Sequence, residues 1–389
     1  MTAARPRVLL VRGHQANSWH LRPWRHITDR YDVAVLRTRR NWFDTESLGV
    51  ETRDARAIRD LLPAGRLGHT LARIPGDRYL SPRTAFEGTD IVHSQDLGFW
   101  YSMQAAKYRR ELGFKLVLTV WETIPFLDAY RNVRTRPYRR RVLEAGDLFL
   151  PTSERARAAL LLEGAPPERI RVVPPGVDDE LFAGAAAPDP PPSEHLVVSA
   201  GRLVWEKGHQ DLLRAVAALR RRVLPDVDRD TPVPRVLIVG AGPEERRLRR
   251  YAGELGIEER VEVRAEVPYA EMPALYARAS CLVLGSLPVW FWEEQFGMVL
   301  AEAMAARLAV MAAASGAIPE VVRGAAPIFA PGDWTELARQ LASGPLARPP
   351  GERVAYPAEL LETHSGAAYG ERLASAYESV LGRDAAAMP

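Results

Sequence analysis

The stretch of sequence that decides the fold is PVWFWEEQFGMVLAEAMAARLAVMAAASGAIPE, Pro288–Glu320. A helical pattern rich in Ala, Met and Leu begins after Gly297, and the apolar run LAVMA follows it, which predicts a helix that leads into a buried strand. Glu294 and Glu302 flank the glycine, and on one helix they would lie roughly 12 Å apart, a spacing that suits two parts of one long ligand. The segment Gln295–Gly297 would form the helix N-terminus, where free N–H groups attract hydroxyl or phosphate oxygens.

The same succession of strand and helix runs through the whole chain. Short apolar runs rich in β-branched residues alternate with amphipathic helical patterns, which predicts parallel sheets with right-handed crossovers. We therefore expect an α/β fold of two doubly wound, Rossmann-like domains that face each other across a cleft, with ligands at the carboxyl ends of the strands. The runs cover residues 7–11, 31–36, 90–94, 115–120, 147–152 and 170–175, and then 196–201, 235–240, 261–263, 281–286, 308–312 and 327–330.

A Pro- and Ala-rich stretch, AGAAAPDPPPS at 183–193, interrupts this alternation and predicts a linker between the domains. The 389 residues are enough for two domains with separate cores. We expect an N-terminal domain over 1–183, a linker over 184–193, a C-terminal domain over 194–365, and a last helix in 366–389 that packs back on the first domain.

Composition excludes several classes of protein. Hydrophobic residues make up 47% and charged residues 26%, as in ordinary globular proteins, and a net charge of +3 is too small to indicate nucleic acid as a partner. One cysteine, Cys281, excludes a disulfide or Cys-based metal framework. The amino terminus shows neither a signal peptide nor a membrane span, so we expect a cytoplasmic protein. Oligomeric state is left open.

The segment GRLVWEKG, between Gly201 and Gly208, follows a predicted strand and precedes a helix. Arg fills almost every cationic position, so each of the chain's three lysines is a candidate for a site that needs a compact ammonium. Arg202 and Lys207, with helix amides, would neutralise a diphosphate leaving group without a metal ion. The alternative is a solvated loop with ordinary surface charges.

Four segments in order resemble the second domain of the retaining glycosyltransferases of family 4, which have the GT-B fold. They are GRLVWEKG, VLIVGAGPEERRL, PVWFWEEQFGMVLAEAMA and ASGAIPEVV, within about residues 196–325. The first domain resembles the family more loosely through DIVHSQD, GDLFLPTSERAR and IRVVPPGVD. The resemblance implies a hexosyltransferase-type enzyme that moves a sugar from a nucleotide-diphosphate sugar to a hydroxyl acceptor, with retention of configuration and with no metal or other cofactor.

Carried over residue by residue, the family pattern implies roles for the motif residues. Arg202 and Lys207 would hold the donor diphosphate, Glu294 would contact the donor sugar, and Glu302 would accept hydrogen bonds from the ribose. A helix Glu favoured by the dipole and an exposed helix Glu are the simpler alternatives for the two glutamates. With Glu122 these give the expected catalytic residues Arg202, Lys207, Glu294 and Glu122, and the expected donor-binding residues Gly13, Gly201, Glu266, Val267, Gln295, Phe296, Gly297, Met298 and Glu302.

The first domain departs from the family pattern. Trp121 stands where many members have a His that lines the donor sugar, Glu122 remains as the nearby polar residue, Pro175 replaces a common Asn, and the Gly-rich first loop is reduced to Gly13. Packing is the alternative role for Trp121, a structural hydrogen bond for His93 and a helix cap for Ser153. The expected acceptor-side residues are His93, Trp121, Ser153 and His14.

The acceptor is not identified, and a glycolipid, a polysaccharide or a small natural product would all suit the family. The run Arg131–Arg141 would fit an anionic acceptor or a weak contact with a membrane surface, although a solvated helix start is the simpler interpretation. The element DVDRD at 226–230 resembles a metal motif, but its Pro- and Arg-rich surroundings favour a solvated turn. Alternative functions are another GT-B enzyme, such as an epimerase or phosphorylase, and a non-catalytic nucleotide-sugar binding protein.

Overall fold

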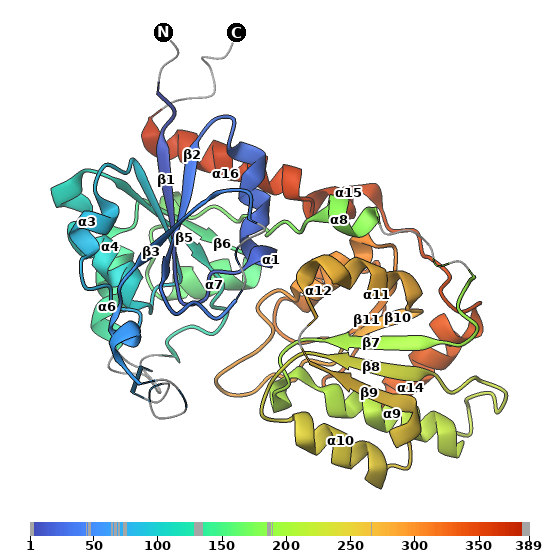
Figure 1. Ribbon diagram of the computed structural model, residues 1–389. Helices are drawn as coiled ribbons and strands as arrows, with labels where there is room; N and C mark the ends of the chain where they lie inside the picture. The colour runs from blue at the N-terminus through green and yellow to red at the C-terminus, as the bar shows by residue number, and fades with distance from the viewer. Residues whose placement is uncertain are drawn as a thin grey trace. The chain divides into compact units, whose positions relative to one another are not determined.

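The computed structural model describes residues 4–382, except 44, 46–47, 64, 66–67, 69–70, 73–75, 128–134, 185–187, 189 and 266. The chain forms two compact units. Unit 1 contains the chain up to Val177 together with the part from Ser365 onward, and unit 2 is Asp178–His364. Each unit is an α/β layer structure around one parallel sheet of six strands (Figure 1).

The sheet of unit 1 has the strand order β3-β2-β1-β4-β5-β6, and all its pairings are parallel. Its strands are β1 Arg7–Gly13, β2 Asp32–Thr38, β3 Glu51–Ala55, β4 Ile91–Gln95, β5 Lys115–Val120 and β6 Leu148–Pro151. The helical elements are α1 Ser18–Leu21, η1 Arg22–Ile27, η2 Ile58–Leu61, α3 Pro82–Phe86, α4 Trp100–Leu112, α6 Arg136–Ala145, α7 Glu154–Leu162, η4 Pro167–Arg169 and α16 Gly366–Leu381.

Both faces of this sheet are covered, as the continuous apolar runs predict. Val8 and Leu10 of β1 belong to one hydrophobic cluster, whereas Leu9 and Val11 belong to another on the opposite face. Successive side chains of a strand point to opposite faces, so a strand that is apolar throughout must be covered on both sides.

Two elements of unit 1 differ from the sequence prediction. The run 170–175 lies along β6 without forming a full strand: Arg171 N donates to the Phe149 carbonyl at 3.0 Å and Val173 N to the Pro151 carbonyl at 2.9 Å, and Pro174 and Pro175 then have no backbone N–H to continue the ladder. The charged segment Glu51–Ala55 is a strand that periodicity did not indicate, since it lies at the exposed edge and carries no apolar face.

The sheet of unit 2 has the order β12-β11-β10-β7-β8-β9 and is also parallel. Every run predicted in the second half forms a strand: β7 Leu196–Ala200, β8 Arg235–Val239, β9 Val261–Arg264, β10 Cys281–Leu284, β11 Ala309–Ala313 and β12 Ile328–Phe329. The helical elements are α8 Asp179–Ala183, η5 Trp205–Lys207, α9 His209–Arg221, α10 Glu245–Glu254, η6 Glu258–Arg260, η7 Tyr269–Glu271, α11 Met272–Arg278, α12 Met298–Ala305, α13 Ile318–Val322, α14 Trp334–Ser343, η8 Pro345–Ala347 and α15 Ala358–Thr363.

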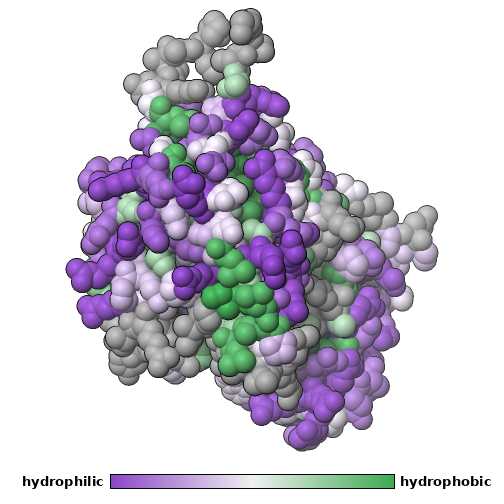
Figure 2. Space-filling view, turned by 60° about the vertical axis from the view of Figure 1, so that its left-hand side comes forward, coloured by the Kyte–Doolittle hydropathy of each residue, from purple (hydrophilic) through white to green (hydrophobic). Residues whose placement is uncertain are grey.

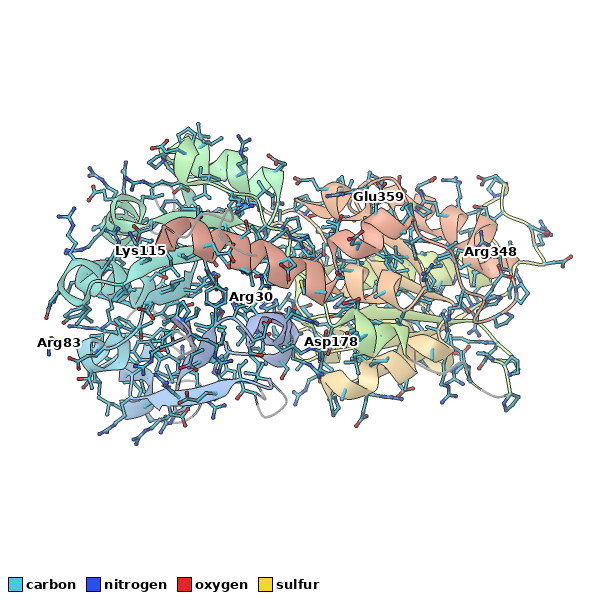
Figure 3. The ribbon with its side chains drawn as sticks, turned by 90° about the horizontal axis from the view of Figure 1, so that it is seen from above. Arg30, Arg83, Lys115, Asp178, Arg348 and Glu359 are labelled. Carbon is cyan, nitrogen blue, oxygen red and sulfur yellow. The ribbon has the colours of Figure 1, made fainter. Side chains whose placement is uncertain are left out.

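The units divide at Val177/Asp178 and at His364/Ser365. Helix α8, which we placed in the first domain, packs in unit 2 against α11 and α12. Helix α16 packs on η1 of unit 1, where the Trp24 Nε1–H donates to the Tyr377 hydroxyl at 3.0 Å. Figure 3 shows α16 with Arg30 beside it, and Arg30 forms an ion pair with Glu371 of this helix at 2.7 Å.

The surface shown in Figure 2 is mainly hydrophilic, and hydrophobic residues gather most visibly in a central area of this view. Within the described part of the chain, no helix combines the length and the hydrophobicity that crossing a bilayer requires.

Candidate functional site

The loop Gly201–Gly208 of unit 2 is held by backbone contacts that only glycine permits. Gly208 has φ +67°, and a Cβ there would lie 1.8 Å from the carbonyl oxygen of Gly285 at the end of β10. Gly240 has φ +149°, and its Cβ would lie 1.9 Å from the carbonyl oxygen of Gly201. The carboxyl ends of β7, β8 and β10 therefore touch through bare backbone, which brings the loop close to the sheet.

His209, which the sequence pattern did not indicate, follows this loop and binds back to the residues at its start. Its Nδ1 is 2.8 Å from the Ser199 hydroxyl, and its Nε2 is 3.2 Å from the carbonyl oxygen of Arg202. Burial lowers the pKa of His209 to about 4, so the ring is neutral. A neutral ring with Nε2–H donating to the carbonyl must accept from Ser199 at Nδ1, and this arrangement holds the backbone of Arg202 in place.

Lys207 and Glu294, 87 residues apart in the chain, form the centre of the candidate site. The Lys207 Nζ lies 2.7 Å from Glu294 Oε2, and the Ser286 hydroxyl donates to the same oxygen at 2.5 Å. The ammonium also lies 5.0 Å from the ring centroid of Trp292. Arg202 is exposed at the start of the loop. The structure thus brings two predicted residues together as an ion pair, with a second, exposed cation on the same loop.

The backbone of Glu294 is clamped by the turn after β11. Ala317 N donates to the Glu294 carbonyl at 2.9 Å, and a Cβ on Gly316 would lie 2.0 Å from that oxygen. Glu294 lies outside the helix, because Gly297, at φ +86°, is the N-cap of α12, which begins at Met298. The prediction that both glutamates share one helix axis was therefore wrong, and the spacing calculated from helical rise does not apply.

Glu302, on α12, is buried, with 4% of its surface exposed, so the alternative of an exposed helix Glu was wrong. The hydroxyls of Tyr269 and Tyr276 interact with its carboxyl group. Burial raises the pKa of Glu302 to about 7, although the two tyrosines lower it in part. A carboxyl group that is partly protonated at neutral pH can both donate to and accept from hydroxyl groups.

The other predicted donor residues have mixed exposure. Phe296 is buried, with 2% of its surface exposed, so it can offer a ligand only its backbone, whereas Gln295 and Met298 are partly exposed around the N-terminus of α12. Val267 is partly exposed in an irregular segment. Glu266 lies outside the described residues.

In unit 1, Trp121 and Glu122 follow directly after β5. Trp121 is 9% exposed and stacks on His20, with ring centroids 4.8 Å apart. Glu122 is paired with Arg139 of α6 at 2.5 Å, and Arg139 also binds Glu163 at 2.7 Å. Glu122 is therefore anchored by a cation on a neighbouring helix.

Asp96, directly after β4 in the segment DIVHSQD, lies beside the candidate residues Trp121 and Glu122, and the sequence pattern did not indicate it. It has φ +48°, and its Oδ1 accepts from Trp121 N at 2.7 Å. Burial first, and then the charge of Glu122, raise the pKa of Asp96 to about 7. Two carboxyl groups thus adjoin each other at the ends of β4 and β5.

His93 and His14 are buried and have partners at both ring nitrogens. His93 is 0% exposed, with Nδ1 2.6 Å from the Tyr377 hydroxyl and Nε2 2.8 Å from the Thr119 hydroxyl. His14 is buried between Asp77, at 2.5 Å from Nδ1, and Arg59, at 3.3 Å from Nε2. Both ring nitrogens are occupied in each case, so the predicted direct contact with an acceptor is corrected to a structural role.

Ser153 and Gly13 have clear local reasons for their identity. The Ser153 hydroxyl accepts from Ala156 N at 3.1 Å and caps α7, as the simpler alternative predicted. Gly13 ends β1 at φ +57°, and a Cβ there would lie 2.8 Å from the ring of Tyr101. Of the run Arg131–Arg141, residues 131–134 lie outside the described residues, and the rest spans the start of α6.

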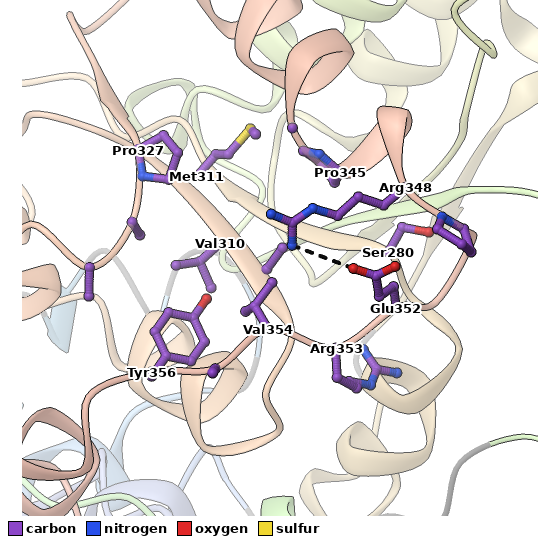
Figure 4. A pocket seen from close by; sticks show the side chains of 16 residues that line it. Ser280, Val310, Met311, Pro327, Pro345, Arg348, Glu352, Arg353, Val354 and Tyr356 are labelled. Atoms are coloured by element: carbon purple, nitrogen blue, oxygen red, sulfur yellow. Dashed lines mark ion pairs between the residues drawn. The ribbon is translucent and has the colours of Figure 1, made fainter.

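Unit 2 also has a hollow of about 350 Å³ at the amino-terminal ends of β10 and β11, lined by Ser280, Val310 and Tyr356 (Figure 4). Arg348 and Glu352 face each other across it at 3.8 Å. This hollow lies at the amino-terminal ends of the strands, whereas Ser286 follows the carboxyl end of β10, so the hollow is separate from the candidate donor site.

The described residues contain no group of three or more His, Cys, Asp or Glu side chains arranged to hold a metal ion. In the Asp-rich element at 226–230, Asp226 pairs with Arg339 at 2.6 Å, and Asp228 accepts from the Asp230 amide at 2.9 Å. These contacts are those of a surface turn.

Comparison with known protein families matches each half of the chain. Residues 21–181 match the model described as Glycosyltransferase Family 4, and residues 185–344 match Glycosyl transferases group 1. A D-inositol 3-phosphate glycosyltransferase from Mycobacterium tuberculosis is 31% identical over 259 residues, which cover 60% of this chain and 49% of the relative. The match thus spans about half the length of that relative.

Solved structures share the fold over nearly the whole chain. Sucrose-phosphate synthase from Thermosynechococcus elongatus has a TM-score of 0.73 at 19% identity and covers 97% of this chain and 100% of its own. The Anabaena protein HepE in complex with UDP and glucose has a TM-score of 0.70 at 18% identity and covers 96% of this chain and 100% of its own. At these identities the likeness shows the fold alone.

Proposed function

Because the chain belongs, through both of its halves, to the GT-B glycosyltransferases related to family 4, we propose that it moves a sugar from a nucleotide-diphosphate sugar to a hydroxyl acceptor. The observation that carries the proposal is the Lys207–Glu294 pair with the Ser286 hydroxyl, at the carboxyl ends of the strands of unit 2. An ammonium beside a buried carboxylate provides one group for phosphate oxygens and one for sugar hydroxyls. UDP-glucose, with which HepE was solved, has both kinds of group.

In the proposed mechanism, Arg202 and Lys207 hold the donor diphosphate and stabilise the charge that develops as it leaves. Glu294, fixed by the turn at Gly316, accepts from sugar hydroxyls, and Glu302 contacts the ribose. Such donors act strongly because they are already in position before the reaction. No metal or other cofactor is part of the proposal.

We further propose that the sugar keeps its anomeric configuration. The proposed donor groups include no side chain placed as a nucleophile, so the acceptor hydroxyl would attack from the face that the diphosphate leaves, and a diphosphate oxygen would take its proton. Trp121 and Glu122 of unit 1 are the proposed acceptor-side residues. A glycolipid, a polysaccharide and a small hydroxyl compound all remain candidate acceptors.

The test begins with the thermal stability of the protein in the presence of UDP-, GDP-, ADP- and TDP-sugars. A donor present at a free concentration of about 100 times its Kd stabilises the folded state by about 2.7 kcal/mol. Transfer of labelled sugar from that donor to candidate acceptors is then measured in the wild type, in Lys207→Ala and in Lys107→Ala, an exposed lysine on α4.

We expect Lys207→Ala to lose about 10²–10³-fold in kcat and Lys107→Ala to match the wild type. Isomerised donor or sugar phosphate as the product would instead show an epimerase or a phosphorylase. Donor binding without turnover for any acceptor would show a binding protein.

A further inference from the structure

A small hollow in unit 1 lies at the carboxyl ends of β1, β4 and β5. Its volume is about 10 Å³, room for one water-sized group. The lining includes groups from three strands, from the segment after β1 and from α16. The side chains that matter here are Arg12, His20, Trp24, Thr119, Trp121 and Tyr369.

Arg12 brings a buried positive charge to this hollow. It is 4% exposed, and its Nη1 donates to the carbonyl oxygens of Val11 at 3.0 Å and His93 at 2.9 Å. Among the described residues Arg12 forms no salt bridge, both of its side-chain hydrogen bonds are made by Nη1, and its guanidinium carbon lies 5.5 Å from the ring centroid of Trp24. Burial lowers the pKa of Arg12, and the charge of Asp96 opposes this as a smaller influence. A guanidinium has five N–H groups, so several remain for a ligand.

His20 adds a neutral hydrogen-bond donor. Asn17 Oδ1 accepts from His20 N at 2.9 Å, which fixes the orientation of the Asn17 amide, and its Nδ2 then lies 3.4 Å from His20 Nδ1. Because Nδ2 can only donate, Nδ1 accepts and the ring hydrogen is on Nε2. Burial lowers the pKa of His20 to about 3, so the ring carries no charge at neutral pH.

A chain of hydrogen bonds orients the hydroxyl of Tyr369. The Trp24 Nε1–H donates to Tyr377 Oη at 3.0 Å, and Tyr377 Oη lies 2.6 Å from His93 Nδ1. His93 Nε2 lies 2.8 Å from the Thr119 hydroxyl, and Thr119 interacts in turn with the Tyr369 hydroxyl. In the proton arrangement in which Tyr377 donates to His93, His93 to Thr119 and Thr119 to Tyr369, the Tyr369 O–H remains to donate into the hollow.

We propose that this hollow binds one oxygen of an anionic group, a carboxylate or a phosphate, on the acceptor substrate. The guanidinium, the imidazole N–H and the phenol O–H are all donors, and a site of donors around an unpaired cation favours an anionic oxygen. The volume admits one such oxygen and leaves the rest of the ligand outside. This inference rests on the proposed function, in which the donor's own phosphates bind Arg202 and Lys207 of unit 2.

The test measures anion binding without any sugar donor. Acetate and inorganic phosphate are titrated at constant ionic strength, and the rise in melting temperature gives an apparent Kd for each anion. The variants are Arg12→Gln, Tyr369→Phe and, as a matched control, Arg110→Gln, an exposed arginine on α4. Anions bound at Arg202 and Lys207 contribute equally in all four proteins, so the differences report on the hollow.

We expect the apparent Kd of at least one anion to rise about tenfold or more in Arg12→Gln and about fivefold in Tyr369→Phe, with no change in Arg110→Gln. The anion with the larger change identifies a phosphate or a carboxylate on the acceptor. Unchanged binding in both hollow variants, or no binding to the wild type, would show a site for a structural water and overturn the inference. If Arg12→Gln does not fold, Tyr369→Phe decides.

The outcome is independent of the donor reaction. Sugar transfer that persists while neither hollow variant alters anion binding would refute this inference and leave the proposed function standing. Anion binding that depends on Arg12, in a protein that transfers no sugar, would refute the proposed function instead. In a transfer assay, Tyr369→Phe should raise the KM of an anionic acceptor and leave that of its neutral analogue unchanged.

Discussion

Replacing Lys207 by methionine should both destabilise unit 2 and stop sugar transfer, and a second replacement should separate the two effects. The side chains of Lys207 and Glu294 are 14% and 7% exposed, and their charged atoms are 2.7 Å apart. Removing the ammonium leaves a buried carboxylate with the Ser286 hydroxyl, and breaking such a pair costs about 3–5 kcal/mol. In Lys207→Met/Glu294→Gln the charge is gone and the amide oxygen still accepts from Ser286, so we expect a residual loss of only about 1 kcal/mol.

Urea unfolding followed by tryptophan fluorescence measures the stability, because the Trp292 ring lies beside Lys207. Turnover of the donor identified by thermal shift measures the activity, which should fall about 10²–10³-fold in the single and the double variant alike. Recovery of stability without recovery of turnover would show that the pair is kept for binding and chemistry. A double variant as unstable as the single one, or a single variant with normal turnover, would refute the reasoning.

Two further predictions concern the same unit. Burial raises the pKa of Glu302 from 4.5 to about 7, so the unfolded chain ionises first as pH rises. The stability of the wild type relative to Glu302→Gln should therefore fall by about 3 kcal/mol between about pH 4.5 and 7 and stay constant above that range. Urea unfolding across this pH range measures it, and a constant difference would contradict the assigned burial. Gly208→Ala should cost at least about 2 kcal/mol, because its Cβ would meet the Gly285 carbonyl at 1.8 Å. Gly113→Ala, also at positive φ but with open space around it, is the matched control and should cost only about 1 kcal/mol, so equal losses would show that the contact is not decisive.

Much of the fold could be predicted because it depends on local periodicity. All six strands of unit 2 coincide with predicted apolar runs, and the central strands β7, β10 and β11 are apolar at nearly every position because both of their faces are covered. The prediction failed where the local pattern is silent, as at the charged edge strand Glu51–Ala55, or where proline blocks the ladder, as at 170–175. The start of α12 was inferred correctly from Gly297, but the position of Glu294 outside the helix was not.

The candidate site was predictable only as a set of residue types. The rarity of lysine singled out Lys207 and the spacing of two glutamates singled out Glu294, but neither pattern could show that the two residues form an ion pair across 87 residues. From the sequence, His93 could have contacted the acceptor. Its burial and the two partners of its ring, Tyr377 of α16 and Thr119 of β5, come from distant segments and are visible only in the fold. The only sequence indication of a role for Asp96 was its place in DIVHSQD, a segment that loosely resembles the family.

The sequence by itself determined most of the order of strands and helices, the glycines of the loop Gly201–Gly208 and the family that both halves resemble. These features depend on residues that are neighbours in the chain, so periodicity reveals most of the elements and the resemblance of short motifs reveals the family. Only the tertiary structure decided which groups are desolvated and which are paired. Arg12 could not be told apart from the many other arginines of this chain until the fold placed it, unpaired and buried, beside the hollow of unit 1, because the free energy of a charge depends on the surroundings that distant segments supply.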